Sequence, residues 1–160
     1  MNRLTPLVKG IITGIVLVIF SLVLYYSKTP NSKLNYLIYL LYALGIAWTL
    51  ISYSRSPGFT GKFADSFGQG FRCFIVVTLI MVAFTTIFSM QHPEFADEAA
   101  TYYREDLVKQ GNKTPAEIDK LVADVKKQYT TSIVSLTIFG YLITGAIITA
   151  AGSALLMRRK

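Results

Sequence analysis

The chain has 160 residues, of which 52% are hydrophobic, and it carries a formal net charge of +7. Its length predicts one domain, and its long uncharged apolar blocks argue against a soluble helical protein, whose outward helix faces carry frequent charges. The positive charge does not indicate nucleic-acid binding: most basic residues flank the apolar blocks, and the six from Arg104 to Lys127 share a segment with eight acids, so no basic stripe can follow a phosphate backbone.

Four apolar blocks are long enough to cross a bilayer, which requires about 20 residues. They predict spans over about 8–27, 34–54, 72–91 and 130–157 of a single membrane domain, 1–160. The first block lies close to the N-terminus, where a signal peptide is the competing interpretation. No small-x-small cleavage site follows it, so we interpret it as a retained span. The fold class is therefore all-α, with four transmembrane helices.

The distribution of charge favours one orientation of these spans. Eight basic residues fall on one side, opposed there only by Asp65, and three of them form the Arg-Arg-Lys terminus. Eight also fall on the other side, but six of those belong to a long loop with eight acids, where they count for less. We therefore expect both termini in the cytoplasm.

Residues 92–129 are predicted to form an extracytoplasmic αα-hairpin between spans three and four. The first helix has one apolar face, made by residues four apart: Phe95, Ala99, Tyr103 and Leu107. Gly111 is a helix stop, and Thr114-Pro115-Ala116-Glu117 is a capping box that opens a second helix, which continues into span four. The hairpin is either a self-packed cap or a docking surface for an extracytoplasmic partner.

Residues 55–71 are predicted to form an amphipathic inner loop that lies in the plane of the membrane surface. Four phenylalanines recur along it at intervals of four, just before Arg72: Phe59, Phe63, Phe67 and Phe71. Three glycines weaken any helix here by up to about 1 kcal/mol each. The loop is either a bilayer-anchored connector or a site for a partner or a lipid headgroup.

Small residues allow helices to pack closely in lipid, where no hydrophobic force drives them together. The candidate packing or partner residues lie in spans one and four: Gly10, Gly14, Gly145, Ala146, Ala150, Gly152 and Ala154. Span four is the expected central packing helix, either within the bundle or against another subunit.

The inventory of chemical groups predicts that the chain is not an enzyme. The uncharged blocks between the flanking cations contain no Asp, Glu, Lys, Arg or His. The chain has no Gly-rich phosphate loop, and one cysteine and one histidine cannot form a zinc motif. We therefore expect no catalytic, metal or cofactor-binding residue and no cofactor. His92 beside Glu94 is interpreted as a helix cap, and hydroxyls such as Thr13, Thr78, Thr85 and Thr86 are expected to bond to carbonyls of their own helices.

Two stretches together resemble a known family. One is Phe67-Gly68-Gln69-Gly70-Phe71-Arg72; the other is His92-Pro93-Glu94-Phe95, followed by an acidic helix, Gly111 and a Thr-Pro-Ala-Glu-Ile cap. In order and spacing the whole chain resembles the four-span inner-membrane family of Bacteroidota catalogued as domain of unknown function 4199. The resemblance implies a Gram-negative cytoplasmic membrane and a periplasmic hairpin, without an assigned activity. His92 departs from the pattern, in which an Asp is expected before the proline.

The leading hypothesis is a non-catalytic accessory or scaffold subunit of a bacterial cytoplasmic-membrane (envelope) complex. Its partners would be membrane lipids and other membrane subunits or further copies of the chain, with no nucleic acid. The alternative is a small oligomeric transporter or channel for lipids or solutes, with a polar path between subunits. A third hypothesis is an enzyme that acts on a lipid headgroup through Arg72, His92 or Glu94.

Overall fold

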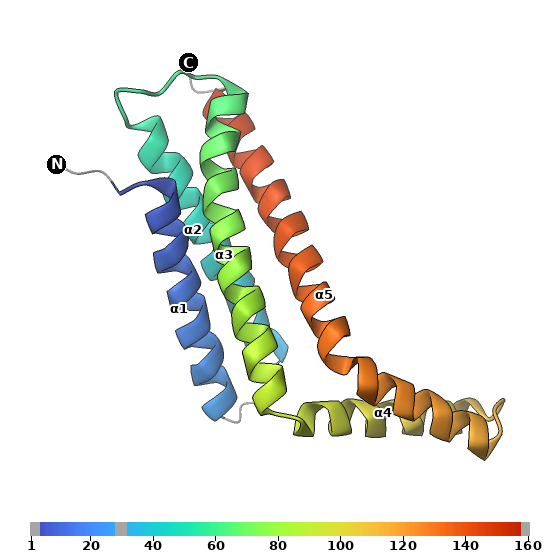
Figure 1. Ribbon diagram of the computed structural model, residues 1–160. Coiled ribbons are helices and arrows are strands. Elements are labelled where there is room, and N and C mark those ends of the chain that lie inside the picture. Colours follow the sequence, from blue (N-terminus) through green and yellow to red (C-terminus); the bar gives the residue numbers. More distant parts are fainter. Residues whose placement is uncertain (1–3, 28–31, 158–160) are drawn as a thin grey trace. The chain divides into compact units, whose positions relative to one another are not determined.

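The computed structural model describes residues 4–27 and 32–157, except for the side chains of 32–35. Within this range it contains five helices and no strand (Figure 1). The helices are α1 (Pro6–Tyr26), α2 (Ser32–Ser54), α3 (Phe63–Gln91), α4 (Glu94–Gln110) and α5 (Pro115–Met157). The cations counted above at Arg3, Lys28 and 158–160 lie outside the described residues.

The chain divides into two units. The first comprises α1, α2, α3 as far as Met81 and α5 from Ile138, and the second comprises Val82–Thr137.

Four helices are long and apolar enough to cross a membrane, which confirms the predicted all-α class with four such helices. They are α1, the Tyr36–Ser54 part of α2, α3 and α5, with mean hydropathies of 2.6, 1.6, 2.4 and 2.0. Large apolar side chains remain exposed along them, including Ile19, Leu44, Leu79 and Ile147. In water such faces would be unfavourable, whereas lipid tails would solvate them.

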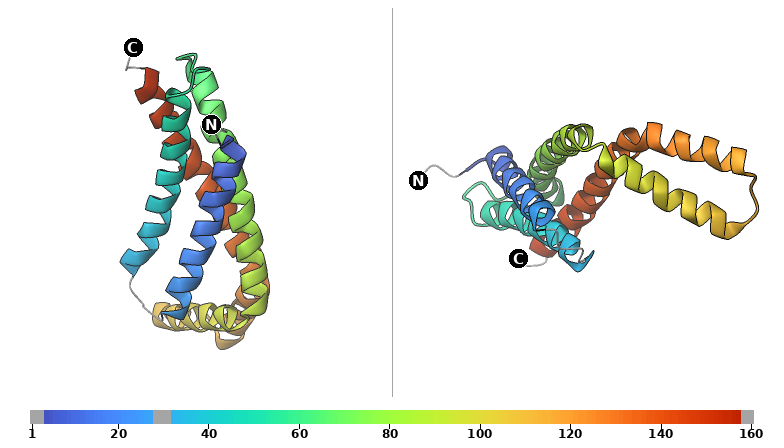
Figure 2. Two further views of the ribbon diagram at one scale, coloured as in Figure 1. Left: turned by 90° about the vertical axis from the view of Figure 1, so that its left-hand side faces the viewer. Right: turned by 90° about the horizontal axis from the view of Figure 1, so that it is seen from below.

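The helices of the first unit lie side by side (Figures 1 and 2). The start of α1, the end of α2, the start of α3 and the end of α5 meet at one end of this unit, together with the connector 55–62. We call this the connector end. The core between the helices includes the fully buried side chains of Leu17, Tyr42, Ile46 and Val77.

The structure corrects the expected separate loop 55–71. Because α3 begins at Phe63, only residues 55–62 connect α2 to α3, and Phe63, Phe67 and Phe71 belong to the first turns of a continuous helix. Their rings stack in sequence, with centroids 5.7 Å and 6.3 Å apart. The three rings therefore lie along one face of an unbroken helix. No separate segment that could lie in the plane of the membrane remains between the connector and α3.

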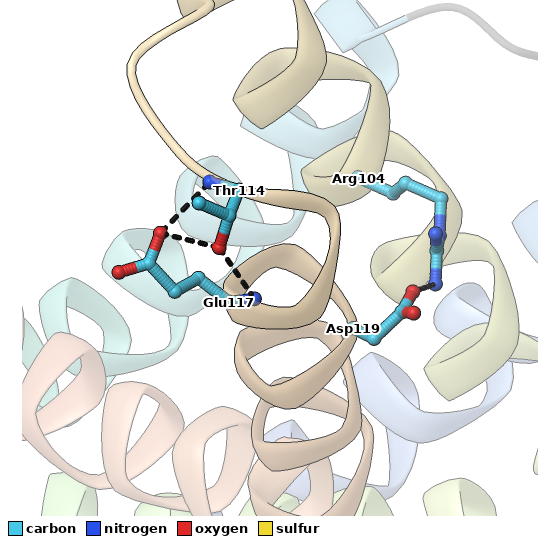
Figure 3. Close-up of polar contacts among 4 residues, drawn as sticks. All are labelled: Arg104, Thr114, Glu117 and Asp119. Carbon is cyan, nitrogen blue, oxygen red and sulfur yellow. Dashed lines mark hydrogen bonds and ion pairs between the residues drawn. The ribbon is translucent and has the colours of Figure 1, made fainter.

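The second unit contains a helical hairpin made of α4 and the first part of α5, which lie antiparallel (Figure 2). Gly111 ends α4 with a left-handed φ of 65°, a conformation that glycine adopts without steric cost. The predicted capping box is confirmed: the Thr114 N–H donates to Glu117 Oε2 at 2.8 Å, and the Glu117 N–H donates to Thr114 Oγ1 at 3.4 Å (Figure 3).

Contacts between the two helices hold the hairpin together. Arg104 pairs with Asp119 at 2.6 Å (Figure 3), and Lys126 pairs with Asp97. Leu107, from the predicted apolar face of α4, and Ile118 of α5 are buried. Exposed ion pairs contribute at most about 1 kcal/mol each, so buried apolar contacts of this kind are the main stabilising interaction.

Candidate functional site

The candidate packing glycines of α1 lie against α3. A Cβ added to Gly10 would lie 2.7 Å from the carbonyl oxygen of Cys73, and one added to Gly14 would lie 2.6 Å from Cδ1 of Ile80. Both glycines are buried. They therefore take part in packing within the chain, where any larger residue would push α1 away from the α3 backbone.

Gly145 of α5 makes room for a buried hydrogen bond. A Cβ at this position would meet the Tyr42 hydroxyl and would lie 2.8 Å from Cγ of Phe74. The Tyr42 hydroxyl instead donates to the carbonyl oxygen of Tyr141 at 2.9 Å. Gly152 is also used inside the chain, because a Cβ there would lie 2.6 Å from Cδ1 of Leu50.

The three candidate alanines of α5 are placed differently from these glycines. Ala146 and Ala150 are half-buried and Ala154 is exposed. They stand four residues apart, so they share one helix face. The small side chains on this face allow another helix to approach closely.

A pocket of about 380 Å³ lies at the connector end, and we call it the Lys9 pocket. Its apolar lining comes from Leu4, Pro6 and Trp48, and its cations are Lys9 and Arg55. Its other polar groups are Thr49, Ser52, Tyr53, Ser56 and Gln69. None of these described lining residues is acidic, so the pocket combines positive charge, hydroxyl groups and an apolar wall.

Lys9 is the most unusual residue of this pocket because it is only 6% exposed. It lies in the first turn of α1, and its ammonium group is 5.6 Å from the centroid of the Trp48 ring. Such a cation–π contact stabilises a lysine by about 0.5–1 kcal/mol at exposed sites and more where water is excluded. Trp48 itself remains 40% exposed.

A second pocket, of about 400 Å³, lies beneath the connector and includes Arg72, the cation that follows the predicted phenylalanine series. Asp65 also lines it and accepts a hydrogen bond from Thr60 Oγ1 at 2.5 Å. Tyr53 closes the connector by donating to the Gly58 carbonyl oxygen at 3.3 Å, and its ring centroid is 5.5 Å from that of Phe59. Phe59 therefore packs against the end of α2.

In the second unit, His92 and Glu94 are in direct contact, with Nδ1 and Oε1 2.6 Å apart. This hydrogen bond lowers the pKa of the Glu94 carboxyl below its ordinary value. The imidazole ring also lies against Phe88, with centroids 4.4 Å apart. The pair bridges the corner between α3 and α4, where the backbone leaves one helix and begins the next.

The model of a family described as a protein of unknown function, DUF4199, matches residues 9–159 of the chain. The chain belongs to the DUF4199 family. No curated protein and no solved structure matches it. The predicted match to domain of unknown function 4199 is confirmed.

The DUF4199 match covers residues 9–159 as a whole and assigns no role to any single residue. Within the described part of this DUF4199 chain, no group of three His, Cys, Asp or Glu side chains could hold a metal ion. The predicted back-bonding of hydroxyls is confirmed for Thr13, Thr78 and Thr86, which donate to carbonyl oxygens of their own helices at 2.8 Å.

Sequence reasoning missed the Lys9 pocket of this DUF4199 chain. Lys9 was counted as one of the cations that flank an apolar block, and neither Trp48 nor Arg55 was singled out. One signal was present: Lys9 precedes Gly10 and stands four residues before Thr13, so it shares the small-residue face of α1. A cation on the packing face of a helix is a candidate for burial.

Proposed function

We propose that the chain is a non-catalytic accessory or scaffold subunit of a bacterial cytoplasmic-membrane complex. Its four span-capable helices would cross the membrane, with the hairpin on the periplasmic side and both termini in the cytoplasm. Membrane lipids and other membrane subunits, or further copies of the chain, would be its partners.

The membrane placement is supported by the exposed apolar faces of the helices and by the charges near their ends. Arg55, Lys62 and Arg72 lie at or near the connector end, whereas the hairpin balances six bases with eight acids. Cytoplasmic loops carry an excess of basic residues. The connector end would therefore face the cytoplasm.

The proposed accessory role is supported mainly by Ala146, Ala150 and Ala154 of α5, which we call the alanine strip. Gly145 and Gly152 are already occupied by packing inside the chain, while Ala154, at the end of the strip, is exposed. Small residues on an outward face permit close helix–helix contact in lipid. The strip therefore suits a helix of another subunit.

The test is a mass measurement on the protein expressed at its native level and extracted in a mild detergent. We expect a heteromeric particle in the wild type, and we expect Ala154→Leu to release the partner because the larger side chain holds the other helix away. Ala83→Leu, which enlarges an exposed alanine on α3, is the matched control and should keep the complex intact.

Two results would contradict this proposal. A particle mass that Ala154→Leu leaves unchanged would remove the alanine strip as the contact surface. A wild-type particle that contains only copies of this chain would remove the accessory role and favour the oligomeric transporter instead.

A further inference from the structure

We propose that the Lys9 pocket binds the phosphate-bearing headgroup of an anionic lipid. The inference rests on the membrane placement proposed above, but it is independent of the accessory role. It concerns a site that the family match leaves unassigned.

The charge and polarity of the pocket suit a phosphate group. Lys9 supplies positive charge from α1 and Arg55 from the first residue of the connector, and Ser52 of α2 and Ser56 of the connector add hydroxyl groups. Charge-assisted hydrogen bonds to phosphate are stronger than neutral ones, and arginine offers paired donors for it. The described lining residues include no carboxylate that would repel the anion.

The burial of Lys9 strengthens this preference. Lys9 is only 6% exposed. An anion beside its ammonium group would therefore interact with it across a medium that is less polar than bulk water. Arg55 is exposed and lines the same pocket. One cation of the pocket is thus buried and the other is exposed.

The position of the pocket favours a lipid over a soluble phosphate compound. It is lined by Leu4, Pro6 and Lys9 at the start of the apolar window of α1, which runs Pro6–Tyr26. Leu4 is exposed, and so is Ile12, which follows Lys9 by three residues on the same side of that helix. Acyl chains could lie along these side chains while the headgroup occupies the pocket. Basic pockets between helices on the cytoplasmic side are known headgroup sites.

The size of the pocket is also compatible with a headgroup. Its volume of about 380 Å³ is at the lower end of the roughly 300–1,000 Å³ typical of ligand sites. Trp48, 40% exposed at the pocket, has the amphipathic ring that membrane proteins place at the level of lipid headgroups.

Trp48 is the only tryptophan of the chain, so its fluorescence reports directly on this pocket. The full chain would be reconstituted into bilayer discs of phosphatidylcholine. Phosphatidylglycerol with brominated acyl chains, which quench nearby tryptophan, would then be compared with brominated phosphatidylcholine at the same mole fraction. We expect the wild type to prefer the anionic lipid by at least about tenfold, from two cations near the headgroup.

Substitutions of single basic residues test whether the preference for the anionic lipid arises at the Lys9 pocket. Lys9→Gln and Arg55→Gln should each reduce it by about fivefold, and Lys9→Arg should retain it. Lys62→Gln is the matched control, because Lys62 is an exposed cation of the connector that lines neither pocket. Should Lys9→Gln fail to fold, Arg55→Gln still tests the site, since it replaces an exposed side chain.

Several outcomes would overturn the proposal. Equal quenching by the two lipids, or equal losses in Arg55→Gln and Lys62→Gln, would show ordinary bilayer contact. Displacement of the brominated lipid by inorganic phosphate at millimolar concentration would assign the pocket to a soluble anion. A chain that does not enter the discs would overturn the membrane placement as well, whereas a chain that enters them without lipid preference would overturn the headgroup site alone.

Discussion

Buried hydroxyl groups in the core between the helices differ in whether they have a hydrogen-bond partner, and they therefore differ in their effect on stability. Thr149, Ser153 and Ser66 are fully buried, and their side-chain oxygens have no hydrogen-bond partner among the described residues. Thr78 is also buried, but it donates to the Phe74 carbonyl oxygen at 2.8 Å. A buried polar group without a partner loses its interaction with water and gains nothing in return.

This contrast predicts effects of opposite sign for the same substitution. Thr149→Val should raise the free energy of unfolding by about 1 kcal/mol, because it removes an unpaired hydroxyl at nearly constant shape. Thr78→Val should lower it by about 0.5–1 kcal/mol, because it removes a hydrogen bond. Unfolding midpoints in mixed detergent micelles would measure both. A loss of stability in Thr149→Val would mean that its hydroxyl is satisfied in the membrane.

At the scale of the elements, local signals were predictable and long-range contacts were not. Gly111 and the Thr114–Glu117 box act within four residues, so the sequence pattern was sufficient to predict the end of α4 and the start of α5. Span three was predicted to begin at residue 72, where the uncharged apolar block begins, and Gly68 and Gly70 were expected to weaken any helix before it. In the structure Gly70 receives the Thr149 side chain, and this contact between helices outweighs the intrinsic propensity.

The capping box makes the start of α5 sensitive to acid. The backbone hydrogen bond from Thr114, followed by that from its hydroxyl, lowers the pKa of Glu117 below its ordinary value of 4.5. A carboxyl whose pKa is lower in the folded state stabilises that state above its unfolded pKa, and this contribution is lost as the pH falls through the folded pKa.

We therefore expect the Thr114 amide resonance to titrate with a midpoint below 4.5, the ordinary value for a glutamate. Protection of the hairpin amides from hydrogen exchange should fall in step as the pH drops through that midpoint. In Glu117→Gln the Thr114 titration should disappear. A midpoint at or above the ordinary value would show that Glu117 does not cap the helix in solution.

For the whole molecule, the difference between local sequence signals and long-range contacts explains why four span-capable helices were predicted and the Lys9 pocket was not. Span length depends on consecutive residues, and hydropathy reports it directly. The pocket takes its lining from α1, α2, the connector and α3, and its cations fall on positions where basic residues ordinarily face solvent. Which of them turns inward is decided by the packing of α1 against its neighbours.

The proposed orientation is open to a direct test because Cys73 is the only cysteine and is buried. Gly58→Cys places a thiol on the connector, where an added Cβ meets nothing within 4 Å, and Asn112→Cys places one in the exposed hairpin turn. In spheroplasts, a membrane-impermeant maleimide should label Asn112→Cys at once and Gly58→Cys only after permeabilisation, because the basic connector end remains inside. The wild type is the unlabelled control. The reverse labelling pattern would invert the orientation and place the Lys9 pocket at the outer leaflet.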